Sequence, residues 1–171
     1  MVRSSWGKHK PNSPARNAIW LSAFIGVTFQ QGRRTPEAKP LLKVNEPDVL
    51  ALELKDDGIF PNSNLKLLVY RKVVDLPEKD PPSIFEQLFT TNKWHGSWRN
   101  GIYRYHHYHS TDDEVLGVYR GSAKVQLGRE NGLVLDIYAG NVIIIPAGVA
   151  HKNLKSRADF GVVGAYPEGQ D

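Results

Sequence analysis

Hydrophobic and polar residues alternate along much of this 171-residue chain, in short segments separated by turn-forming glycines such as Gly121, Gly140 and Gly148. Alternation with a period of two places every second side chain on one face, which is typical of half-buried β-strands. The expected strands cover residues 50–54, 65–74, 101–109, 114–120, 122–128, 133–138, 142–146, 149–154 and 160–166. Many short strands at even spacing predict an all-β sandwich or barrel.

Two segments depart from this alternation. Residues 142–146 are apolar without interruption, which predicts a strand covered on both faces. Ser83 precedes Glu86 by three residues, the spacing of a helix capping box, and Leu88 and Phe89 continue with helical spacing. We therefore expect one short helix, closing an end of the barrel.

The strongest chemical signal is a set of three histidines and one glutamate. His107 and His109 are two residues apart, so in an extended chain they share a face. Glu114 follows a polar break and would begin the returning strand of a hairpin, opposite both imidazoles. His151 follows a Pro-x-Gly turn that can direct it toward the same point. Such ligands suit one divalent Fe, Mn, Ni, Zn or Cu ion without choosing among them. The alternative for Glu114 is a hydrogen bond to a metal-bound water or an imidazole.

The spacing of these residues resembles the two motifs of the cupin superfamily. The first, G(X)5HXH(X)3,4E(X)6G, is matched by Gly101, His107, His109, Glu114 and Gly121. The second, G(X)5PXG(X)2H(X)3N, is matched by Gly140, Pro146, Gly148 and His151. The final asparagine is replaced by Lys155, and the nearest asparagine is Asn153. The resemblance covers residues 60–167 and implies a jelly-roll barrel, also called a double-stranded β-helix.

Segments flanking the motifs are similar to a subgroup of small single-domain cupins. They are Trp98-Arg99-Asn100-Gly101 and residues 158–167. Relatives in this subgroup tend to continue beyond Gly169, so we expect that the chain is truncated after Asp171. The resemblance also implies a homodimer.

Other polar and aromatic residues near the motifs have two interpretations each. Alternation places Tyr103 and Tyr105 on the face of His107 and His109, either lining a pocket or packed in the core. His106 and Arg104 point the opposite way. Arg120 is expected at the solvent rim, with binding of an anionic substrate as the alternative. Asp112 and Asp113 are expected to form a turn.

Charge divides the chain into a basic N-terminal extension, residues 1–40, and a single cupin domain, residues 41–171. The extension holds seven Lys or Arg against one acid, while the remainder holds fifteen against seventeen. A nucleic-acid partner is therefore not expected for the folded part. The longest apolar run, residues 18–29, is shorter than the about 20 residues that a membrane-spanning helix needs.

Composition bears only weakly on localisation. The chain has no cysteine, which excludes disulfides and thiolate chemistry. We expect a cytoplasmic protein. The Arg- and Ser-containing start makes mitochondrial import the alternative, and a disordered tail or an added element packed on the barrel would also account for it.

The resemblance implies a metal-dependent enzyme that acts on a small organic molecule. An oxidoreductase of the dioxygenase type is favoured because such enzymes are frequent in the superfamily. An isomerase or lyase is the alternative within the same class. The alternative to an enzyme is a non-catalytic cupin that binds metal or ligand as a sensor or storage protein.

Overall fold

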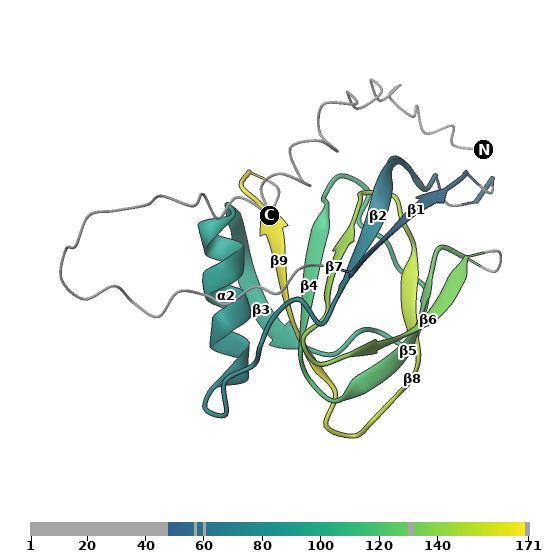
Figure 1. Cartoon of the computed structure of the whole chain (residues 1–171). Helices are drawn as coiled ribbons and strands as arrows, with labels where there is room; N and C mark the ends of the chain where they lie inside the picture. The colour runs from purple at the N-terminus through teal and green to yellow at the C-terminus, as the bar shows by residue number, and fades with distance from the viewer. Residues whose placement is uncertain (1–47, 57, 60, 130–131, 170–171) are drawn as a thin grey trace.

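The computed structural model describes residues 48–56, 58–59, 61–129 and 132–169. The predicted extension, residues 1–40, lies outside the described residues, as do residues 41–47 of the predicted domain. Figure 1 shows two β-sheets facing each other, with one helix beside them. The elements are β1 (Asp48–Leu54), β2 (Ser63–Arg71), α2 (Pro81–Thr91), β3 (Trp94–Asn100), β4 (Glu114–Arg120), β5 (Ser122–Leu127), β6 (Leu133–Tyr138), β7 (Val142–Ile145), β8 (His151–Ser156) and β9 (Gly161–Pro167).

The larger sheet has the strand order β1-β2-β7-β4-β9-β3, and the smaller sheet has the order β6-β5-β8. Neighbouring strands run antiparallel, and strands distant in sequence, such as β2 and β7, are neighbours. Crossing between two sheets in this way is the jelly-roll arrangement. The predicted all-β fold with one short helix is confirmed.

Two hydrophobic cores lie on opposite faces of the larger sheet. Between the sheets, Leu116 and Val118 of β4 pack with Ile143 and Ile145 of β7. On the outer face, Val115 of β4 belongs to a second cluster that includes residues of α2. Strand β7 is buried along its whole length, because its odd and even positions enter different cores. The prediction of a strand covered on both faces is therefore confirmed.

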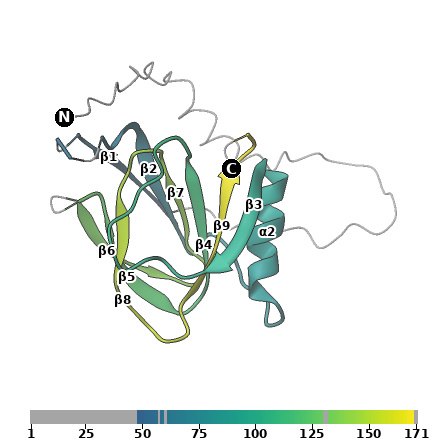
Figure 2. The ribbon, with the colours of Figure 1, turned by 180° about the vertical axis from the view of Figure 1, so that it is seen from behind.

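Helix α2 packs on the outer face of the larger sheet, against β3, β4 and β9, rather than over an open end of the barrel. Figure 2 shows it on the side of β3 and β9 that faces away from the smaller sheet. The contact is close because Gly117 has no side chain: a Cβ there would overlap the ring of Phe85.

The predicted capping box is wrong. The helix begins at Pro81, after an N-cap Asp80 that makes no side-chain capping hydrogen bond. Two prolines open the helix and have no N–H to be capped, so less remains for a capping box to satisfy. Ser83 Oγ instead donates to the carbonyl of Asp80 (2.8 Å), and Glu86 pairs with Arg99 of β3.

The predicted strand over residues 101–109 is also wrong. This segment is irregular, and its one ladder contact is an isolated bridge between His107 and His151. The strand lies just before it, as β3, which pairs with β9. A register shift in β3 between His95 and Trp98 surrounds Gly96, whose φ is +61°. Glycine suits a β-bulge of this kind because it adopts a left-handed backbone conformation without strain.

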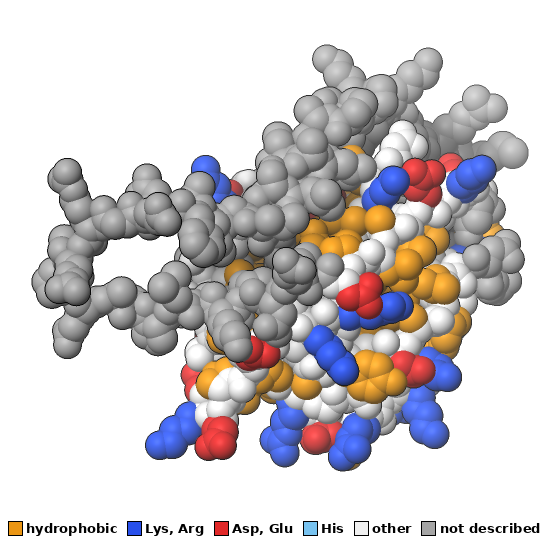
Figure 3. Space-filling model, viewed as in Figure 1, with side chains coloured by type: hydrophobic (Ala, Val, Ile, Leu, Met, Phe, Trp, Pro, Cys, Tyr) orange, Lys and Arg blue, Asp and Glu red, His pale blue; other side chains and the backbone are white. Residues whose placement is uncertain are grey.

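Charged side chains of both signs are spread over the described surface. On the face drawn in Figure 3, Lys and Arg side chains are interspersed with Asp and Glu. Some are paired across β1 and β2, as in Lys66 with Glu53 (3.5 Å) and Arg71 with Asp48 (3.4 Å). Among the described residues no helix is long and apolar enough to cross a membrane.

Candidate metal centre

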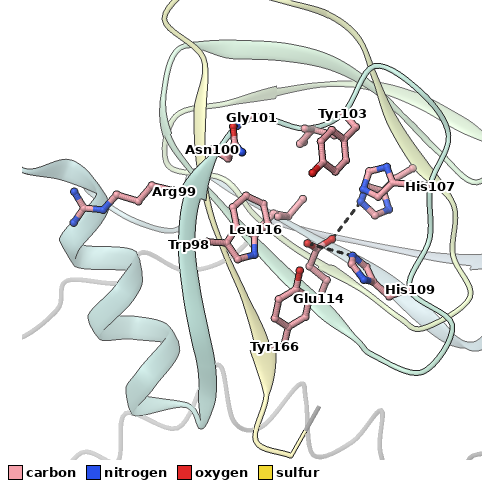
Figure 4. A pocket seen from close by; sticks show the side chains of 12 residues that line it. Trp98, Arg99, Asn100, Gly101, Tyr103, His107, His109, Glu114, Leu116 and Tyr166 are labelled. Carbon is pink, nitrogen blue, oxygen red and sulfur yellow. Dashed lines mark hydrogen bonds and ion pairs between the residues drawn. The ribbon is translucent and has the colours of Figure 1, made fainter. Parts of the chain in front are cut away.

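A pocket of about 340 Å³ opens beside the larger sheet and contains all four predicted ligands. Figure 4 shows aromatic side chains on one wall and the histidines on the other, with Glu114 between them. The lining residues are Trp98, Arg99, Asn100, Gly101, Ile102, Tyr103, His107, His109, Glu114, Leu116, His151 and Tyr166.

Glu114 is the centre of the polar cluster. Its Oε1 lies 3.6 Å from Nε2 of His109, and its Oε2 lies 3.2 Å from Nε2 of His151. The His151 contact is close enough for an ion pair, although Oε2 receives no hydrogen bond of good geometry from the described residues. The ring of His107 lies 4.1 Å from that of His151, centroid to centroid. The structure thus brings all four side chains together.

Backbone hydrogen bonds bring these residues to one place from three segments. His107 and His151 exchange backbone hydrogen bonds of 3.3 and 2.9 Å, and Gly148 N donates to the carbonyl of His109 (2.7 Å). Gly148 has a φ of +88°, and a Cβ there would overlap the carbonyl of Asn62, so the turn before His151 requires glycine. The bridge between His107 and His151 and the turn at Gly148 therefore position the histidines, where a regular hairpin strand was expected.

His107 and His151 are oriented by main-chain carbonyls. Nδ1 of His107 lies 3.4 Å from the carbonyl of Tyr105, and Nδ1 of His151 lies 3.3 Å from that of Val149. In the neutral tautomer that directs Nδ1–H at these carbonyls, Nε2 has the lone pair that a metal ion requires.

The pKa values of the cluster reflect burial and mutual contacts. Burial, with a smaller contribution from His151, lowers the pKa of His107 to about 4. A hydrogen-bonding contact with Glu114 raises the pKa of His109. Burial alone would raise the pKa of Glu114, but its contacts with His109 and His151 outweigh burial and bring it to about 2. Glu114 is therefore an anion in a nearly dry place.

In the part of the chain that the structure describes, no group of three or more His, Cys, Asp or Glu side chains has the spacing of an assembled metal site. The donor set nevertheless fits a divalent transition ion in kind: three imidazoles and one charged, buried carboxylate. Ligand roles for His107, His109, Glu114 and His151 stay predictions.

Comparison with known proteins gives one relative of high similarity. The uncharacterised protein YjlB of Bacillus subtilis (strain 168) is 42% identical over 115 residues, which are 67% of this chain and 67% of YjlB. The chain belongs to the same family as YjlB, and its fold is the jelly-roll barrel of the cupins. No protein-family profile matches it.

Solved structures similar to this cupin have low sequence identity. Acireductone dioxygenase from Bacillus anthracis, with cadmium in its active centre, is 13% identical and has a TM-score of 0.41, over 71% of this chain and 79% of its own. The dTDP-4-dehydrorhamnose 3,5-epimerase from Elizabethkingia anophelis NUHP1 is 9% identical and has a TM-score of 0.41, over 72% of this chain and 76% of its own. Likeness at this level carries no information on activity.

Of the two tyrosines expected near the ligands, one lines the pocket. Tyr103 lines the pocket, whereas Tyr105 does not, and their rings stack with centroids 4.9 Å apart. They are 53% and 61% exposed, so the alternative of core packing is wrong. His106 points elsewhere, with Nε2 3.3 Å from Oε1 of Gln126, and Arg104 is exposed, both as expected.

The remaining polar predictions have mixed outcomes. Arg120 is exposed and lies 3.7 Å from Asp159, outside the pocket lining, as expected of a rim residue. Asp113 does more than form a turn: it is buried, and its Oδ1 accepts a 2.8 Å hydrogen bond from Ala147 N, in the turn that precedes His151.

Sequence reasoning missed the aromatic wall of the pocket. Trp98 of β3, Gly164 of β9 and Leu116 of β4 are direct partners in one row across three strands. Tyr166 lies two residues after Gly164, on the same face. The signal was present as Trp98 before the first motif and Gly164-Ala165-Tyr166 after the second, but only strand pairing joins them.

Proposed function

We propose that this cupin binds one divalent transition metal through His107, His109, Glu114 and His151, and that it is a small-molecule metalloenzyme. The observation that carries the proposal is the position of Glu114. Its carboxylate is 3% exposed and lies within 3.6 Å of two imidazoles, beside a third, at the side of a pocket. A buried charge surrounded by titratable side chains in a cleft supports a functional site.

The pocket volume supports a small organic ligand. About 340 Å³ is at the lower end of the range of pockets that bind small molecules, about 300 to 1,000 Å³. The walls combine apolar surface from Ile102 and Leu116 with hydroxyl groups from Tyr103 and Tyr166. A ligand there would be held by apolar contacts and oriented by a few hydrogen bonds.

The other groups in the pocket favour chemistry carried by the metal over proton shuttling. Burial raises the pKa of Tyr166, which keeps its hydroxyl protonated at neutral pH. Arg99 is turned away from the pocket toward α2 (Figure 4), with Nε 2.6 Å from Glu86. Beyond the four proposed ligands, the described lining thus offers hydrogen-bond donors rather than a base. We therefore favour oxidation of the dioxygenase type over isomerisation.

A bound ion would act as a Lewis acid and, if redox-active, as a centre for oxidation by dioxygen. Around it the protein would supply fixed ligands from β4, β8 and the segment before β4. Tyr103 would orient the organic molecule through its hydroxyl, and Trp98 would keep water from its apolar face.

Elemental analysis of the protein purified without added metal tests the metal site. We expect one equivalent of a divalent transition metal, lost in the double variant His107→Ala/His109→Ala. His106→Ala is the matched control, because its imidazole faces Gln126 outside the pocket lining. Unchanged metal content in the double variant would show that these ligands are wrong.

Oxygen consumption by the metal-loaded protein, over a panel of small organic molecules, tests the reaction class. Uptake that depends on both metal and organic substrate supports an oxygenase. Stoichiometric metal without any turnover would favour a non-catalytic metal- or ligand-binding cupin instead.

A further inference from the structure

The pocket wall opposite the histidines contains two large side chains that the proposed metal site does not use. Trp98 comes from β3 and Tyr166 from β9, two strands that pair with each other. Both line the pocket, and both point toward Glu114 in Figure 4. Their arrangement relative to Glu114 is specific enough to assign a role.

The indole of Trp98 packs directly against Gly164. Its direct cross-strand partner is Gly164, and a Cβ added there would overlap the six-membered ring of the indole. Gly164 has no positive φ, so the backbone does not call for glycine at this position. What the site requires is room: the indole lies against bare backbone of β9, and this brings its N–H toward Tyr166.

Tyr166 lies between the indole and the carboxylate. Its hydroxyl points to both groups in Figure 4. Burial and then the charge of Glu114 raise the pKa of Tyr166, and its contact with the indole of Trp98 opposes them. The pairing of Val115 with Ala165 places Glu114 and Tyr166 next to each other on neighbouring strands. The ring of Tyr166 also meets that of His109 edge-on, with centroids 5.4 Å apart.

Glu114 needs a donor that is not a histidine. In the structure its two oxygens face Nε2 of His109 and Nε2 of His151. A histidine that binds a metal must use the lone pair of that nitrogen, so it can no longer donate a proton to the carboxylate. A tyrosine hydroxyl can donate a hydrogen bond to the carboxylate in both the metal-free and the metal-bound protein.

We propose that Tyr166 is a positioning residue for Glu114. Its hydroxyl is held by the indole of Trp98, which packs against Gly164, and it fixes the carboxylate among the three histidines. The assignment rests on the proposed metal site, since the position of Glu114 matters only if Glu114 is a metal ligand or hydrogen-bonds to a metal ligand. It predicts that Tyr166 acts on metal affinity through Glu114 without itself touching the ion.

The first experiment measures Co²⁺ affinity by competition with a chelator, after removal of any resident metal. Tyr166→Phe removes only the hydroxyl, and we expect affinity to fall about 10- to 100-fold, the usual effect of losing a partner of a metal ligand. The visible spectrum of bound Co²⁺ should change as well. Tyr119→Phe is the matched control, because Tyr119 lies on β4 outside the pocket lining.

The second experiment needs no metal. In the metal-free protein the indole N–H resonance of Trp98 should shift in Tyr166→Phe and keep its position in Tyr119→Phe. Gly164→Ala should displace the same resonance and weaken Co²⁺ binding, because the added methyl group takes the place of the indole. A purely structural role of Tyr166 would lower stability without moving the indole signal or the Co²⁺ spectrum.

Each result bears on a different claim. If the wild-type protein binds Co²⁺ and Tyr166→Phe binds it equally well, the positioning role is overturned while the metal site stands. An unmoved indole resonance in Tyr166→Phe also overturns it. If the wild-type protein binds no divalent metal, the proposed function fails and this role of Tyr166 fails with it.

Discussion

His151 and Glu114 face each other at the side of the pocket, with Nε2 of the histidine 3.2 Å from Oε2 of the glutamate. Their side chains are 2% and 3% exposed, so water contributes little to the solvation of this pair. The carboxylate keeps its charge because imidazole groups surround it. A divalent ion bound to the same nitrogens would take over that task, which couples metal uptake to the release of protons.

The stability of the metal-free protein should decrease in mild acid. His107 has a pKa lowered from 6.5 to about 4, so the unfolded chain takes up its proton at higher pH than the folded one. The free energy of unfolding therefore falls as the pH drops from 6.5 toward 4. His109, whose pKa is raised, contributes in the opposite sense and loses its contribution as the pH rises above 6.5.

Urea unfolding with chelator present, at several pH values, measures this effect. The unfolding midpoint of the wild-type protein should fall more steeply between pH 6.5 and 4 than that of His107→Gln, which has no such proton to take up. Parallel curves for the two proteins would contradict the assignment of the lowered pKa to His107.

Much of the barrel could be predicted from alternation because its strands are regular. Glu114, Leu116 and Val118 share one face of β4 as the period of two requires, and β7 is buried on both faces as its apolar run indicates. In a regular strand the direction of each side chain follows from its position in the sequence, because successive side chains point to opposite faces. The face on which Glu114 lies was therefore predictable without any knowledge of its partners.

The rest could not be predicted because it depends on places where the alternation breaks. Trp94 belongs to the core beneath α2, whereas Trp98, an even number of residues later, lines the pocket. A regular strand would put both on one face. The bulge at Gly96 adds one residue to β3 and reverses the direction in which the later side chains of the strand point. Nothing in the local pattern marks that reversal except the glycine itself.

Gly96 should consequently tolerate asparagine better than alanine. Its φ of +61° lies in the left-handed region, where an ordinary L-residue costs about 1 to 2 kcal/mol. A Cβ there would meet only Tyr166, at an ordinary 3.9 Å, so conformation rather than space sets the cost. Gly96→Ala should be less stable than wild type by about 1 kcal/mol, and Gly96→Asn by less, because asparagine adopts this conformation more readily.

Chemical denaturation of the three proteins under one set of conditions checks the expected order. Equal stability of the alanine and asparagine variants would show that backbone conformation at Gly96 does not hold the bulge.

Gly117 should be intolerant of alanine for the opposite reason, which is lack of space. A Cβ at Gly117 would overlap the ring of Phe85, a residue of α2 that packs against β4. We expect Gly117→Ala to cost about 1 to 3 kcal/mol, as in other overpacked cores. Gly101→Ala is the matched control, because a Cβ there meets nothing within 4 Å, and its cost should stay within about 0.5 kcal/mol.

A double-mutant cycle identifies the cause of the Gly117 effect. Phe85→Leu makes room at the same contact, so Gly117→Ala should cost less in that background than in the wild-type protein. Additive effects of the two substitutions on the free energy of unfolding would mean that the helix contact is not what excludes alanine.

Asp113 should prove important for the position of His151, although it lies far from it in sequence. Its buried Oδ1 accepts the hydrogen bond from Ala147 N, and the adjacent Gly148 N donates to the carbonyl of His109. Asp113→Ala would leave a backbone N–H without its acceptor, at a cost of about 1 to 3 kcal/mol. Asp113→Asn keeps an acceptor oxygen and should cost less. Because the turn leads directly into β8, the alanine variant should also bind metal more weakly.

Thermal unfolding and metal competition, measured on the same set of variants, test both effects of Asp113. Asp112→Ala is the control, since that carboxylate accepts from its neighbour Thr111 and not from the turn before β8. It should leave the unfolding temperature close to that of the wild-type protein and lower the metal affinity less than Asp113→Ala, because its charge acts on His109 without contacting the turn. If Asp113→Ala lost stability but kept its metal affinity, the turn would not be what places His151.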